Sequence, residues 1–175
     1  MEEKRVMVVN EVKGLQIGDF VLIAVLIAAG AVLRLFAGGF INIFGMKPNF
    51  TIAMYCLAIL LTKPSIKESA IIGLITGVVC QLLPGTPYLG LISEPLGAMC
   101  MAVMITLPIK KGMAMAGTFV STVVSGGVFT VLLFIFTHAV ISSLAAYVPI
   151  VLCSAVINCI IVQVLYIPLK KMLKK

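Results

Sequence analysis

The sequence predicts an all-α integral membrane protein, with six transmembrane helices in a single membrane domain over residues 1–175. Hydrophobic residues make up 62% of the chain and the mean hydropathy is +1.23, far above the near-half apolar usage of soluble proteins. A span needs roughly 20 apolar residues, or somewhat fewer where the barrier thins, so this length admits about six short spans. The basic residues then fall almost entirely on one side of those spans, which supports the same count.

The apolar runs and the breakers between them define the individual spans. We place them at about residues 17–36, 50–62, 69–83, 93–108, 113–137 and 148–169.

The first two spans are joined by an apolar connection rich in glycine, residues 37–49. Ala24 and Ala28 lie four positions apart in the first span, so one stripe of that helix lets another backbone approach closely. Asn49 is of the residue type that caps helix N-termini, which starts the second helix there. At 1.5 Å per residue the second helix covers only about 18 Å, so we expect the connection before it to dip into the membrane.

The third and fourth spans are bounded by polar turns and prolines. Lys67 and Glu68 belong to a predicted turn, and the third span after it carries Gly73 and Gly77 in a GxxxG pattern. It ends near the breaker run at residues 84–87, and the fourth span follows from about residue 93 to 108.

The fifth span is the longest, and a short amphipathic connection leads from it to Pro149 and the sixth. Residues of small volume recur at spacing four in the fifth span, where they form a second seam for close helix packing: Gly117, Ser121 and Ser125.

The cations predict the orientation of the bundle. Six spans put both termini on one side, and that side collects all but two of the 13 lysines and arginines. The positive-inside rule assigns that side to the cytoplasm. Only Arg34 and Lys47 are left for the outer face.

Charged residues at membrane depth usually face a cavity or a partner, so Arg34, Lys47 and Glu94 indicate a small-molecule site at the outer face. Two cations and one anion suit a zwitterionic ligand. Three helices also begin on this face, and their free N–H groups favour a ligand carboxylate. We expect Lys47 and Arg34 to bind that carboxylate and Glu94 to bind an ammonium group. The other residues predicted to line the site are Asn42, Phe44, Asn49, Phe50, Gln81 and Tyr88.

Structural alternatives exist for each charged residue. Arg34 and Lys47 are also suited to reach lipid phosphates by snorkelling. Glu94 follows Ser93, and an acid in the first turn after a serine cap stabilises a helix. The single histidine, His138, lies near a span end, where an ordinary interfacial role competes with proton relay.

Several kinds of protein are excluded by what the sequence lacks. No G-x-x-x-x-G-K-[ST] loop occurs, so the chain cannot hydrolyse nucleotide to drive transport, and no H-E-x-x-H or G-x-S-x-G motif marks an enzyme. The five cysteines are odd in number and show no CxxC spacing, so we expect no metal site, and we expect no cofactor. The net charge is +7, but the charged residues lie between apolar runs and do not cluster on one face, which argues against nucleic-acid binding.

Three motifs carry a family resemblance: AAGAVLR at residues 28–34, GMKP at residues 45–48, and Glu94 followed by Pro95. Together with the span number and spacing, they resemble the bacterial tryptophan-transporter family, regarded as substrate-binding S components of energy-coupling factor (ECF) transporters. The resemblance implies a six-helix bundle in the bacterial plasma membrane that binds tryptophan or a related aromatic amino acid at its outer face. It also implies that Ala24 and Ala28 dock onto a transmembrane scaffold subunit carrying two ATPases, in which ATP hydrolysis would take place.

Other functions remain open at this point. The chain can be read as an S component for a vitamin, as a stand-alone secondary transporter for a small zwitterionic solute, or as a structural membrane subunit without a ligand. In a secondary transporter, His138 or Glu94 would carry protons.

Overall fold

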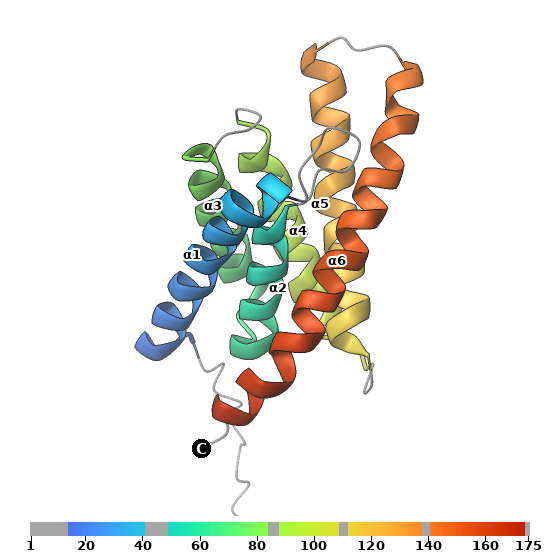
Figure 1. Ribbon diagram of the computed structural model, residues 1–175. Helices are drawn as coiled ribbons and strands as arrows, with labels where there is room; N and C mark the ends of the chain where they lie inside the picture. The colour runs from blue at the N-terminus through green and yellow to red at the C-terminus, as the bar shows by residue number, and fades with distance from the viewer. Residues whose placement is uncertain (1–13, 41–48, 84–87, 109–111, 138–140, 174–175) are drawn as a thin grey trace, which may run out of the picture.

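The computed structural model describes residues 14–40, 49–83, 88–108, 112–137 and 141–173, and all regular structure within them is helical. The helices are α1 (Ile17–Phe40), α2 (Phe50–Thr62), α3 (Ile66–Gln81), α4 (Gly90–Met104), α5 (Met113–Thr137) and α6 (Ile141–Leu173). Successive helices run in opposite directions, so α2, α4 and α6 all begin at the same end of the bundle (Figure 1). The predicted all-α bundle is confirmed.

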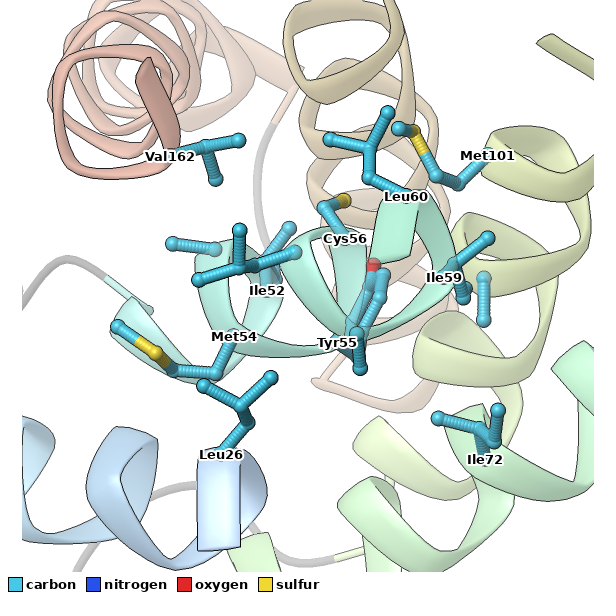
Figure 2. Packing of buried hydrophobic residues seen from close by; sticks show 14 of the residues in the cluster. Leu26, Ile52, Met54, Tyr55, Cys56, Ile59, Leu60, Ile72, Met101 and Val162 are labelled. Atoms are coloured by element: carbon cyan, nitrogen blue, oxygen red, sulfur yellow. The ribbon is translucent and has the colours of Figure 1, made fainter. Parts of the chain in front are cut away.

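Helix α2 is the centre of the bundle. Residues 50–60 are all buried, and α2 contacts each of the other five helices. Figure 2 shows its side chains meeting Leu26 of α1, Ile72 of α3, Met101 of α4 and Val162 of α6. A helix that is apolar on every side is stable only when it is enclosed by other helices, which explains both its composition and its position.

The outer surface of the bundle is apolar. Large side chains such as Val25 on α1, Ile135 on α5 and Val164 on α6 are each more than half exposed. A patch this extensive is not tolerated in water but is suited to lipid. Within the described residues, three helical segments are long and apolar enough to cross a membrane: Ile17–Phe36, Met113–Thr137 and Ala146–Leu173. The surface and these segments mark a multi-pass membrane protein.

Two helix N-termini follow local capping rules. Asn49 caps α2 as predicted, since its side chain accepts a hydrogen bond from the Thr51 amide. Helix α3 begins at Ile66, earlier than the predicted 69, because Ser65 and Glu68 form a capping box. Glu68 therefore lies in the first turn of α3, and its place in a separate turn was wrongly predicted.

Helices α4 and α6 also begin earlier than the predicted residues 93 and 148. Ser93 does not cap α4: the helix begins at Gly90, and Leu89 holds the cap position without a side-chain hydrogen bond. Helix α6 begins at Ile141 and carries Pro149 in its interior. Proline is tolerated within membrane helices because neighbouring groups satisfy the backbone that it frees. The predicted connection before Pro149 is thus part of α6.

Helices α3 and α4 lie in direct backbone contact. A Cβ atom on Gly73 would come within 2.6 Å of the Glu94 carbonyl oxygen, and one on Gly77 within 2.7 Å of the Gly90 carbonyl oxygen. Only glycine allows this approach, as the GxxxG spacing predicts. Glu94 and Pro95 are therefore positioned by the close packing of α4 against the two glycines of α3.

Candidate functional site

The carboxyl group of Glu94 lies inside the bundle, near the starts of α2 and α4. Glu94 is the fifth residue of α4 and only 2% exposed. Its Oε1 accepts a hydrogen bond from Asn49 Nδ2 at 2.5 Å, and its Oε2 accepts one from Ser125 Oγ at 3.2 Å. Groups from the start of α2, from α4 and from α5 therefore converge on one acid. The alternative in which Glu94 only stabilises a helix start is wrong, because Glu94 lies a full turn inside α4.

Asn49 is the best-connected residue of this cluster. Its Oδ1 accepts hydrogen bonds from the amide and the hydroxyl of Thr51, while its Nδ2 donates to Glu94. Its backbone oxygen accepts a bond from Asn158 Nδ2 on α6, at 3.2 Å. Asn49 thus ties the start of α2 to both α4 and α6.

Arg34 brings positive charge to the same region from α1. Its side chain is half-buried, and its guanidinium lies within electrostatic reach of the Glu94 carboxyl and beside the Cys80 thiol. Cys80 in turn contacts the Thr51 hydroxyl at 3.4 Å. The cluster therefore holds one buried acid, one nearby base and several neutral polar groups.

A polar lining continues from Glu94 toward the centre of the bundle. The hydroxyl of Tyr55 is fully buried, and among the described residues it has no hydrogen-bond partner. It lies next to Gly97 and Ser125, since a Cβ atom on Gly97 would collide with both. Ser121 Oγ donates to the Gly97 carbonyl oxygen at 2.7 Å. The small-residue seam of α5 thus serves as the polar wall against α4.

Not all of the residues predicted for the site lie in this cluster. Arg34, Asn49 and Glu94 are brought together. Gln81 instead bridges the connection between α3 and α4, donating to the Gly77 carbonyl oxygen and accepting from the Tyr88 amide. The Tyr88 side chain is 72% exposed, whereas Phe50 is only 2% exposed.

The remaining predicted residues fall elsewhere. Asn42, Phe44 and Lys47 lie outside the described residues, as does His138. Ala24 and Ala28 are exposed on α1.

Three residues of the cluster were missed by sequence reasoning: Tyr55, Ser125 as a partner of Glu94, and Asn158. Asn158 left a signal, because a fully buried amide in an otherwise apolar span is costly and marks a polar contact. Tyr55 and Ser125 left none, since their positions on α2 and α5 become informative only once the packing is known.

Comparison with known proteins addresses the identity of the chain. A protein-family model described as "Tryptophan transporter TrpP" matches residues 16–174, which is nearly the whole chain. Neither a curated protein nor a solved structure matches it. The match includes all six helices and the Glu94 cluster, so the family resemblance noted in the sequence is confirmed. The chain belongs to the TrpP family of tryptophan transporters.

Proposed function

We propose that this protein is the membrane-embedded substrate-binding subunit, or S component, of an ECF-type uptake transporter for tryptophan or a related aromatic amino acid. In this proposal it spans the bacterial plasma membrane six times with both termini in the cytoplasm. The end of the bundle where α2, α4 and α6 begin then faces outward. Membership of the TrpP family supports the substrate, and the single cationic side predicted by the sequence supports the orientation.

The observation that carries the proposal is the position of Glu94. A buried acid in a membrane protein is expensive to maintain, and it is expected where an ion or a charged ligand is handled. Within the described part of the chain, its hydrogen bonds come from two neutral groups, on Asn49 and Ser125. An ammonium group is a stronger partner for a carboxylate than either of these. Glu94 is therefore proposed to bind the substrate ammonium.

The substrate carboxylate is proposed to lie on the basic side of the same site. Arg34 lies within electrostatic reach of Glu94, and the start of α2 adds the positive end of a helix dipole. Lys47 precedes the Asn49 cap by two residues in the chain, so we assign it to the carboxylate as well. A single site would then bind both the ammonium and the carboxylate group of an amino acid.

The aromatic side chain of the substrate is proposed to contact the residues around this polar centre. Asn42 and Phe44 precede the α2 cap in sequence, and Tyr88 precedes α4 with its ring exposed. Phe50 follows Asn49 in the chain and is buried within the bundle, and Gln81 holds the α3–α4 connection.

The energy for uptake is proposed to come from partner subunits. The chain has no nucleotide-binding loop, so a transmembrane scaffold with two ATPases would supply the hydrolysis. Ala24 and Ala28 suit the contact with that scaffold, because both are exposed and small enough for close helix approach.

Tryptophan binding to the purified protein tests the proposal. The chain contains no tryptophan, so the fluorescence of the ligand can be followed without background. We expect saturable binding that weakens at least tenfold, or about 1.4 kcal/mol, in Glu94→Gln and Lys47→Ala. Glu68→Gln is the matched control, because Glu68 is a partly exposed acid in the first turn of α3, outside the cluster. Absence of binding by any aromatic amino acid would refute the proposal, and uptake by vesicles holding this chain alone would favour a secondary transporter.

A further inference from the structure

We propose that the side-chain amide of Asn49 competes with the substrate ammonium for Oε1 of Glu94, so that Asn49 is a positioning residue that substrate displaces. This inference rests on the proposed function, in which Glu94 binds the ammonium. It assigns Asn49 a different role from the direct ligand contact that its sequence position suggests.

The geometry of Glu94 requires a competitor to move. With 2% of the residue exposed, no ammonium group reaches the carboxyl unless one of its present partners leaves. Ser125 Oγ donates to Oε2 from the middle of α5, a helix of 25 residues. Asn49 Nδ2 donates to Oε1 from the end of a helix. Asn49 is partly exposed, whereas Ser125 is only 1% exposed, so a ligand reaches the carboxyl from the side of Asn49.

The backbone of Asn49 supports the same conclusion. As the N-cap of α2 it has φ −89° and ψ 90°, outside the helical region. Its Oδ1 carries the cap, through Thr51, and its Nδ2 carries the bond to Glu94. Rotation of the side chain can withdraw Nδ2 from Glu94 and loosens the Oδ1 cap at the same time, while Asn158 continues to hold the backbone oxygen.

The exchange has a chemical direction. An amide N–H is a neutral donor, whereas an ammonium group brings a full positive charge to a carboxylate that little water reaches, and such bonds are roughly twice as strong. A ligand without an ammonium group gains nothing from displacing Asn49. The competition therefore lowers the affinity for free α-amino acids and leaves that for deaminated indole acids unchanged, so Asn49 sets how strongly the site prefers a ligand with an ammonium group.

The substitution Asn49→Ser separates the two roles. Serine is as good an N-cap as asparagine, but its hydroxyl is too short to cap α2 and to reach Glu94 as well. If Asn49 is a competitor, Asn49→Ser binds tryptophan about three- to tenfold more tightly than the wild type. The affinity for indole-3-propionate, which lacks the ammonium group, stays within about twofold of the wild-type value. If Asn49 is a direct ligand, tryptophan binds more weakly.

A second variant and a wild-type titration complete the test. Asn49→Thr also keeps a cap acceptor and has no group long enough to reach Glu94 as well, so tryptophan should again bind more tightly, and thermal unfolding of both variants reports whether they fold. Unchanged or weaker tryptophan binding by folded Asn49→Ser and Asn49→Thr overturns the inference. If the wild type itself shows no saturable tryptophan binding, the proposed function fails and the inference falls with it, which is a distinguishable result.

Discussion

The substitution Gly73→Ala tests whether the packing of α3 on α4 positions the candidate site. An added Cβ atom would lie 2.6 Å from the Glu94 carbonyl oxygen, 2.6 Å from Pro95 Cα and 2.8 Å from Pro95 N. Carbon atoms pack at about 3.5 Å or more, so α4 has to shift by roughly 1 Å. The obstacle is backbone and not a flexible side chain, so the shift carries Glu94 with it.

Both stability and binding should respond to this shift. Overpacking of this kind costs about 1–3 kcal/mol, and a binding group displaced by about 1 Å loses its productive geometry. We expect a lower thermal unfolding temperature in detergent and a tryptophan affinity reduced about tenfold. Gly127→Ala on α5 is the control, because nothing lies within 4 Å of a Cβ atom there. If Gly73→Ala matches Gly127→Ala in both measurements, the packing argument is refuted.

Three further predictions concern the ends, the polar core and the outside of the bundle. Hydrogen bonds from the backbone amide and the hydroxyl of Ser65 hold the pKa of Glu68 below its ordinary value of 4.5. The stability that these bonds give the folded protein is complete above pH 4.5 and is lost as the pH falls through the lowered pKa. Unfolding temperatures should therefore fall more steeply below pH 4.5 in the wild type than in Glu68→Gln, and parallel curves would contradict the capping box. Asn158→Ala removes the donor to the Asn49 backbone oxygen and should cost about 1–3 kcal/mol in denaturant unfolding, whereas an unchanged midpoint would show that this contact is dispensable. Ala28→Leu should prevent co-purification with a scaffold subunit and leave tryptophan binding intact; undiminished co-purification counts against docking through this stripe.

Much of the fold could be predicted because the long apolar runs of membrane helices are recognisable in the sequence. Helices α2 and α5 have the predicted bounds, since Asn49 is a strong cap for α2 and the breakers Pro108 and Gly112 precede α5. The start of α4 could not be predicted, because Leu89 carries no capping signal. The start of α6 was misplaced because Pro149, a helix breaker in water, is tolerated inside a membrane helix.

The candidate site could be predicted only where it involves charge or a cap. Arg34 and Glu94 stand out in an apolar sequence, and Asn49 stands out as a cap. In the sequence, Tyr55 and Ser125 look like ordinary residues of apolar helices. Their place beside Glu94 becomes visible only when α2, α4 and α5 are packed together. Which hydroxyls meet the Glu94 carboxyl depends on how each helix is rotated about its axis. When all faces of a helix are apolar, the apolar pattern does not determine this rotation.

The most direct test of the central claim, that Glu94 binds a substrate ammonium, compares two ligands in two proteins. Tryptophan and indole-3-propionate share the indole ring and the carboxylate, and only tryptophan carries the ammonium group. Equilibrium binding of both by fluorescence should show at least a tenfold preference for tryptophan in the wild type, or about 1.4 kcal/mol. That preference should disappear in Glu94→Gln, because the amide keeps the shape of the side chain and removes its charge. An equal preference in both proteins would contradict the assignment of Glu94.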